Sequence, residues 1–202
     1  MARMARIVNE QRPVDLLNAI VGYLVQNGVT ELSLRPLAKA VGSSPRVLLY
    51  YFGSKENLIV QAVKSLRQRQ RAGIAKMRAA RFERASDACR AIWKQMSAPE
   101  SEAAFRLSLE TYVLALRHPE LFGDFLSSST ENWLEFLAED LMRRGAPMKE
   151  ARVYASVVIA GFRGLMLDYC ASRDRERLDR ALDLWIESLD AVSKKLGGLG
   201  GE

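Results

Sequence analysis

Apolar side chains recur three and four residues apart along almost all of the 202 residues, and no stretch shows the sustained alternation of a β-strand. This spacing predicts amphipathic helices, each burying one face. Four prolines each precede a helical stretch, where a missing N–H costs nothing: Pro13, Pro45, Pro99 and Pro119. The sequence therefore predicts an all-α fold of about nine helices, at 13–27, 34–41, 45–51, 55–79, 82–97, 99–117, 119–144, 148–172 and 174–196.

Basic residues are concentrated in the N-terminal part of the chain. The whole sequence has 30 Lys and Arg against 24 Asp and Glu, a net charge of +6. Residues 1–80 hold 13 basic and 4 acidic side chains, whereas residues 81–202 hold 17 and 20. The basic part is therefore expected to face a polyanion. We expect an N-terminal domain over 1–60, continued by a long connecting helix at about 55–79, a second domain over 80–196, and a flexible tail at 197–202.

Turn and cap residues in the basic part predict a helix-turn-helix. Ser33 is placed to cap the helix at 34–41, and Gly42 permits a tight turn after it. Ser44 and Pro45 then provide the cap and the first residue of the next helix. Two short helices joined by a glycine turn are the layout of a DNA-reading motif.

The helix that begins at Pro45 has two distinct faces. At about 100° per residue, Leu48 and Phe52 share one face, and Arg46 and Tyr50 lie on the opposite one. An exposed arginine on such a helix can make two hydrogen bonds to guanine in the major groove, and a tyrosine hydroxyl suits a phosphate. An ordinary helical hairpin with a solvated polar face is the alternative interpretation.

The segment LSLRPLAKAVGSSPRVLLYYFGSKENLIVQAV, residues 32–63, resembles the DNA-binding signature of the TetR (tetracycline repressor) family of bacterial transcription regulators. The match is specific over about residues 14–63, and Leu49 departs from it because family members often carry an aromatic residue there. Leu49 is expected to touch a thymine methyl group or to pack. The resemblance implies DNA contacts by eight residues: Ser33, Arg35, Ser44, Pro45, Arg46, Tyr50, Tyr51 and Lys55.

The resemblance also implies a C-terminal helical bundle that binds a small molecule and dimerises. Any large apolar residue there could be core, or could line a cavity between helices, where ligands of helical bundles bind. Since no charged residue stands out as a counter-ion, we hypothesise an apolar effector. The candidates for such a cavity are Phe105, Leu109, Tyr112, Phe125, Trp133, Phe162 and Met166.

The last two helices are the predicted dimer interface. The helix at 148–172 is apolar over more than one stripe and carries small residues that permit close approach, so it needs cover on several sides. In the family, the last two helices of each chain form a four-helix bundle in a homodimer, which binds a pseudo-palindromic operator. Full burial within one protomer is the alternative.

Other classes of protein find little support in the sequence. Cys89 and Cys170 are far apart and lack neighbours at metal-ligand spacing, so we expect reduced thiols, no metal and no cofactor. His118 stands between two predicted helices, where a capping role is favoured over catalysis. With no uninterrupted apolar run of membrane length and no signal peptide, we expect no membrane contact and a cytoplasmic protein. The alternative function is a helical ligand-binding or interaction protein that does not bind DNA.

Overall fold

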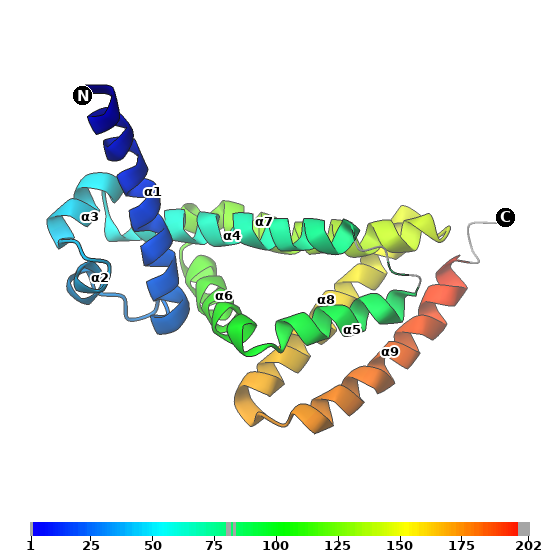
Figure 1. Ribbon diagram of the computed structural model, residues 1–202. Coiled ribbons are helices and arrows are strands. Elements are labelled where there is room, and N and C mark those ends of the chain that lie inside the picture. Colours follow the sequence, from blue (N-terminus) through cyan, green and yellow to red (C-terminus); the bar gives the residue numbers. More distant parts are fainter. Residues whose placement is uncertain (1, 80–81, 83, 198–202) are drawn as a thin grey trace. The chain divides into compact units, whose positions relative to one another are not determined.

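The computed structural model describes residues 2–79, 82 and 84–197. Within that part of the chain the secondary structure is entirely helical, which confirms the all-α prediction (Figure 1). The helices are α1 (Ala2–Asn27), α2 (Leu34–Ala40), α3 (Pro45–Phe52), α4 (Lys55–Ala79), α5 (Ala85–Met96), α6 (Pro99–Arg117), α7 (Pro119–Arg143), α8 (Met148–Ser172) and α9 (Arg175–Gly197).

Three of the four helix starts predicted from proline are confirmed. Pro45, Pro99 and Pro119 are the first residues of α3, α6 and α7. Pro13 is the exception, because α1 already begins at Ala2 and Pro13 lies inside it. A proline removes one backbone hydrogen bond from a helix interior, and α1 continues on both sides of that loss. At the other end of the chain α9 includes Gly197, and the rest of the predicted tail lies outside the described residues.

The described residues pack into two compact units. The first unit comprises those within 1–70 and 106–126, and the second those within 71–105 and 127–202. Three helices, α4, α6 and α7, therefore contribute different stretches to different units. The domain boundary predicted near residue 80 places residues 106–126 in the C-terminal domain. In the structure these residues pack with the N-terminal helices instead. A long helix can bury one stretch in each of two cores, and helical spacing alone does not reveal this.

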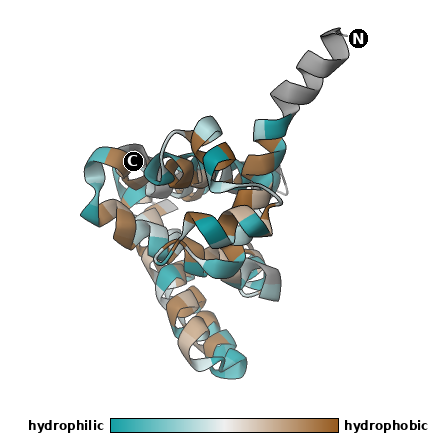
Figure 2. Cartoon of the chain, turned by 90° about the vertical axis from the view of Figure 1, so that its left-hand side faces the viewer, coloured by the Kyte–Doolittle hydropathy of each residue, from teal (hydrophilic) through white to brown (hydrophobic). Residues whose placement is uncertain are grey.

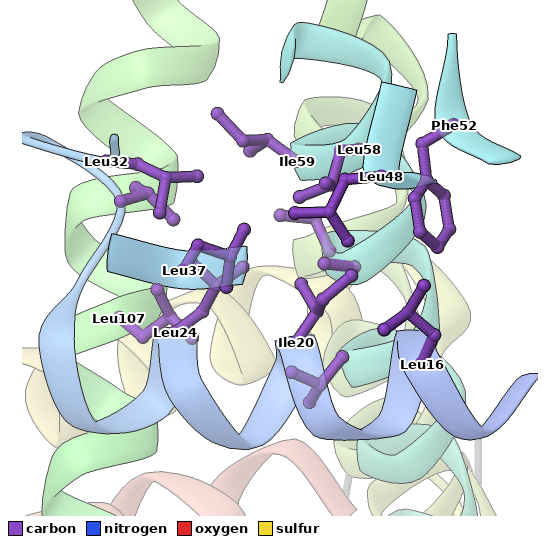
Figure 3. Packing of buried hydrophobic residues seen from close by; sticks show 14 of the residues in the cluster. Leu16, Ile20, Leu24, Leu32, Leu37, Leu48, Phe52, Leu58, Ile59 and Leu107 are labelled. Carbon is purple, nitrogen blue, oxygen red and sulfur yellow. The ribbon is translucent and has the colours of Figure 1, made fainter. Parts of the chain in front are cut away.

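The core of the first unit is built around α1. Figure 3 shows Leu16, Ile20 and Leu24 of α1 pointing toward side chains from the neighbouring helices. Those neighbours include Leu37 of α2 and Leu48 of α3, which are fully buried. Burying one such side chain contributes about 1.5–3 kcal/mol. The helix-turn-helix is therefore part of a shared core rather than an appendage.

The core of the second unit lies among α5, α7, α8 and α9, with Ile74 from the end of α4. The indole Nε1 of Trp93 donates a hydrogen bond to Asp179 at 2.6 Å, which ties α5 to α9. A Cβ on Gly161 would overlap the ring of Trp185, so the glycine lets that ring lie across α8. Cys89 is buried and Cys170 is half-buried, and burial is the main reason that the pKa of the Cys89 thiol rises to about 12.

By length and composition α8 could cross a membrane, with a mean hydropathy of 1.3 over its most apolar stretch. Arg163 and Asp168 interrupt that stretch, and a core helix of a soluble protein passes the same test. Seven residues of α8 are buried within the second unit. Figure 2 shows hydrophobic and hydrophilic residues together along most helices, the pattern of elements that bury one face.

Candidate DNA-binding interface

The two predicted faces of α3 are present in the structure. Leu48 and Phe52 are 0% and 3% exposed and pack in the first core. On the opposite side Arg46 is exposed, and Tyr50 is 81% exposed. A tyrosine with so little cover contributes almost nothing to its own domain's core, so its side chain is available to a partner.

Both ends of α3 are fixed by short-range contacts. Ser44 Oγ accepts a hydrogen bond from the backbone N–H of Val47 at 3.3 Å, so the predicted cap is formed, and Pro45 is the first helical residue. Gly53 ends the helix with a φ of +76°, a conformation that costs glycine little. The eight-residue helix is therefore held at its start and its end, which keeps Arg46 and Tyr50 on one side.

The predicted cap of α2 is only half correct. Ser33 occupies the cap position in extended conformation, with φ −114° and ψ 135°, but its side chain makes no capping hydrogen bond. Its backbone carbonyl accepts the first hydrogen bond of the helix, from the N–H of Leu37 at 3.3 Å. The prediction of a side-chain cap is wrong because a serine can take the backbone conformation while its hydroxyl points elsewhere. Ser33 and Arg35 are both exposed.

The beginning of α4 carries contacts that the sequence analysis missed. Lys55 Nζ donates to the carbonyl of Leu32 at 3.1 Å, which ties α4 to the turn before α2. Ser54 Oγ accepts a hydrogen bond from the backbone N–H of Asn57 at 3.0 Å. The side-chain Nδ2 of Asn57 donates to the carbonyl of Phe52 at 2.8 Å. A serine directly before a helix is the sequence signal for the contact between Ser54 and Asn57. No local sequence pattern predicts the contact between Lys55 and Leu32. An ammonium has three N–H donors, so the Leu32 bond leaves Lys55 able to contact a phosphate.

Tyr51 and Leu49 flank the exposed face of α3. Tyr51 is half-buried against the first core, and its ring meets that of Tyr50 edge-on with centroids 5.1 Å apart. Leu49 is 40% exposed, so it is partly packed and partly accessible. The eight predicted DNA-contacting residues therefore all lie on α2 or α3, directly before one of these helices, or at the start of α4. They range from exposed to half-buried.

The helix-turn-helix carries two exposed arginines. Arg35 and Arg46 are exposed and make no ion pair with any residue in the part of the chain that the structure describes. Leaving a guanidinium unpaired in water is not costly, and its planar donor set matches guanine and phosphate. The arrangement can therefore offer two positive groups and a tyrosine hydroxyl to a duplex.

The seven predicted effector residues are divided between the two units. Leu109, Tyr112 and Phe125 belong to the first, and the rings of Tyr112 and Phe125 meet edge-on at 5.4 Å. Phe105, Trp133, Phe162 and Met166 belong to the second. A groove of about 300 Å³ in the second unit is lined by none of the seven but by Arg71, Ile74, Ala75, Asn132 and Glu135.

The last two helices expose an apolar stripe. On α8, Val153 and Val157 are 63% and 50% exposed, and on α9 Leu184 is 68% exposed. Gly164 of α8 is also exposed, and a Cβ there would meet no atom. Small and apolar side chains therefore face outward on helices whose other faces are buried in the second core.

Comparisons with known proteins agree with this geometry. Residues 16–62 match the model of the bacterial regulatory proteins of the tetR family. A transcriptional regulator from Rhodococcus sp. Rha1 has a similar structure, with 24% identity, a TM-score of 0.67, and 88% of this chain and 95% of that chain covered.

Two further solved structures share the fold. A protein named as a TetR-family transcriptional regulator from Rhodococcus sp. is 20% identical, with a TM-score of 0.66 and 91% and 99% of the two chains covered. GusR from Salmonella enterica is 17% identical, with a TM-score of 0.65 and coverage of 89% and 95%. The comparison with curated proteins finds no match. Residues 16–62 therefore match the tetR family of bacterial regulatory proteins, and the helical fold of the whole chain is shared with these solved structures.

Proposed function

We propose that the protein is a homodimeric repressor that binds a pseudo-palindromic operator and leaves it when a small apolar effector binds. The observation that carries the proposal is the exposed face of α3, where Arg46 and Tyr50 lie opposite the buried Leu48 and Phe52. The B-DNA major groove is about 12 Å wide and admits one helix. In this proposal Arg46 reads a base, and Tyr50, Lys55 and the start of α3 contact phosphates.

The other predicted contacts have supporting roles in the proposal. Ser33 and Arg35 contact the DNA backbone from the start of α2. Ser44 and Pro45 hold the start of α3 against the DNA backbone. Tyr51, being half-buried, holds Tyr50 in place through its ring contact and can present its hydroxyl to a phosphate. Contacts of this kind set orientation and register, whereas base contacts set sequence preference.

The dimer half of the proposal is supported by the exposed stripe on α8 and α9. Exposed apolar residues in a continuous row are a typical interface signal, and small residues between them permit helices to approach. A two-fold dimer would place the same stripe of a second copy against Val153, Val157 and Leu184. Two reading heads related by that axis require two half-sites of opposite orientation.

The effector half of the proposal places the ligand in the second unit. Of the seven predicted residues, Phe105, Trp133, Phe162 and Met166 share that unit, and Phe162 and Met166 are buried in its core. We propose that the effector packs against these four side chains. It releases the operator only in so far as it binds the DNA-incompatible conformation more tightly than the DNA-bound one. The protein acts by binding rather than catalysis, in the cytoplasm.

Selection of duplexes by the full-length protein from a random-sequence library tests the proposal. We expect enrichment of two half-sites related by a dyad, with centres about one helical turn, or a multiple of it, apart. Failure to enrich any sequence over the input library would contradict operator binding and favour a helical ligand-binding protein. Point variants are preferable to deletion of residues 1–80, because that deletion would uncover Leu107 and Phe122 in the first core.

A further inference from the structure

A carboxylate from α6 holds the turn between α1 and α2, residues 28–33. Glu110 Oε2 accepts hydrogen bonds from the backbone N–H of Val29 at 2.7 Å and of Thr30 at 3.3 Å. It also accepts from the Thr30 hydroxyl at 3.1 Å. Two successive backbone N–H groups that face one oxygen form a small anion-binding nest. Glu110 therefore satisfies two donors of the turn, from a position 81 residues after Val29.

The glycine at the start of this turn is fitted to the same carboxylate. Gly28 ends α1 with a φ of +75°, and its N–H donates to the carbonyl of Leu24 at 2.8 Å. A Cβ at this position would overlap the carboxylate of Glu110. The backbone conformation favours glycine at this position, and its lack of a side chain leaves room for the Glu110 carboxylate. The local sequence of the turn and the distant glutamate fit together as one arrangement.

The turn controls where α2 begins. The side chains of Val29 and Leu32 are buried in the first core, at 4% and 7% exposure. The carbonyl of Leu32 accepts from Lys55 at 3.1 Å, so the turn is tied to α4 as well as to α6. Immediately after it comes α2, which carries Arg35 on its exposed side and Leu37 beneath α3. A turn that shifts therefore moves α2, and with it the packing under the reading helix.

We propose that Glu110 is a positioning residue for operator recognition. By holding the α1–α2 turn it fixes the orientation of α2, and through α2 that of α3. The inference rests on the proposed function, and it adds a residue outside the segment 16–62 that matches the family model. Glu110 itself carries the wrong charge to touch phosphate, so its role is exerted through the turn.

Because Glu110 is negatively charged, a positioning role and a purely electrostatic role predict opposite effects of its removal on DNA affinity. Removing a carboxylate from a unit that faces DNA lowers its repulsion from the phosphates, so charge alone predicts tighter binding for Glu110→Ala. Loss of the turn's acceptor predicts weaker binding instead. Glu120→Ala is the matched control, because Glu120 belongs to the same unit and its side chain is 64% exposed.

The experiment measures the affinity of full-length variants for a duplex that the wild-type protein has selected. We expect Glu110→Ala to bind about tenfold more weakly, and Glu120→Ala to bind as tightly as the wild type or slightly more tightly. Glu110→Gln should recover most of the loss, because its amide oxygen can still accept from both N–H groups. In Glu110→Ala, hydrogen exchange at the Val29 and Thr30 amides should be faster, with far-UV circular dichroism unchanged.

Two variants keep the inference testable if Glu110→Ala does not fold. Glu110→Gln retains an acceptor, and Thr30→Val removes only the hydroxyl bond; for Thr30→Val we expect about two- to threefold weaker binding. Unchanged affinity and unchanged exchange in Thr30→Val would then overturn the inference, as would Glu110→Ala binding as tightly as Glu120→Ala. A wild-type protein that selects no duplex would instead contradict the proposed function, so the two failures are distinguishable.

Discussion

Several arginines of the second unit are paired with carboxylates, whereas the two arginines of the helix-turn-helix have no such partner among the described residues. In the second unit Arg177 holds Asp168 with two hydrogen bonds of 2.7 and 2.9 Å, and these bonds lower the pKa of the Asp168 carboxyl. Arg90 and Asp183 pair at 3.0 Å in the same unit. In the first unit Arg35 and Arg46 lie exposed. Exposed ion pairs add little stability, but each one neutralises a cation that could otherwise attract a polyanion.

The net charge of each compact unit separates the two units less clearly than the position of individual arginines does. By packing, the first unit holds 12 basic and 7 acidic side chains and the second 18 and 17. The contrast is smaller than the one between residues 1–80 and 81–202, chiefly because the three basic side chains of residues 71–80 belong to the second unit. Residues 106–126 add two basic and three acidic side chains, including Glu110, to the first unit. The feature that favours DNA binding is therefore the position of Arg35 and Arg46 on the exposed sides of α2 and α3, more than the total charge.

The largest effects should come from substitutions that leave a cavity in one of the two cores. A cavity in the first core should affect DNA binding as well as stability, whereas one in the second core should affect stability alone. Leu48→Ala in the first unit and Ile186→Ala in the second each remove a side chain at most 1% exposed. Each should lower the free energy of unfolding by about 2–5 kcal/mol, measured by urea denaturation. Only Leu48→Ala should also weaken the operator affinity of the folded dimer, because Leu48 lies beneath the reading face. Equal losses of affinity in both variants would contradict a division of labour between the units.

A charge on the exposed stripe of the second unit should come next in size. Leu184→Glu is expected to convert the dimer to a monomer and to weaken operator binding about a hundredfold, since the two heads no longer bind as one. Sedimentation velocity and fluorescence anisotropy measure the two effects. Leu116→Glu in the first unit is the control, because Leu116 is 67% exposed against 68% for Leu184. A Leu184→Glu variant that remains dimeric would place the interface elsewhere.

A smaller effect should follow from removing one phosphate contact. Lys55→Ala should weaken operator binding about fivefold, and the slope of log affinity against log salt should fall by about one per protomer. Lys64→Ala removes the same charge from an exposed site farther along α4 and should change the slope less. Equal slopes for Lys55→Ala and the wild type would remove Lys55 from the DNA contacts and leave it a tether for Leu32.

The spacing of residues along the sequence predicted the two faces of α3 correctly, because the faces of a short helix follow from geometry alone. Leu48, Phe52, Arg46 and Tyr50 lie where 100° per residue places them. Pro13 was misjudged because a proline marks a probable helix start, not an obligatory one, and a helix can continue past the lost hydrogen bond.

Contacts between distant segments could not be predicted in this way. Glu110 reaches a turn some 80 residues before it, and no local pattern in α6 distinguishes it from a solvated glutamate. The predicted effector residues divide between two cores for the same reason, since an apolar side chain at helical spacing does not show which core buries it. Phe125 and Phe162 illustrate this, because both are buried but in different units.

The central claim is that the exposed face of α3 reads bases, and Arg46→Ala tests it most directly. Its binding to a set of duplexes carrying every single-base change in the selected half-site should be compared with that of the wild type and of Arg117→Ala, an exposed arginine in the same unit. We predict a loss of about 1–3 kcal/mol, with discrimination relaxed at one base position in each half-site. A loss of equal size at every position, or one no larger than in Arg117→Ala, would contradict the claim.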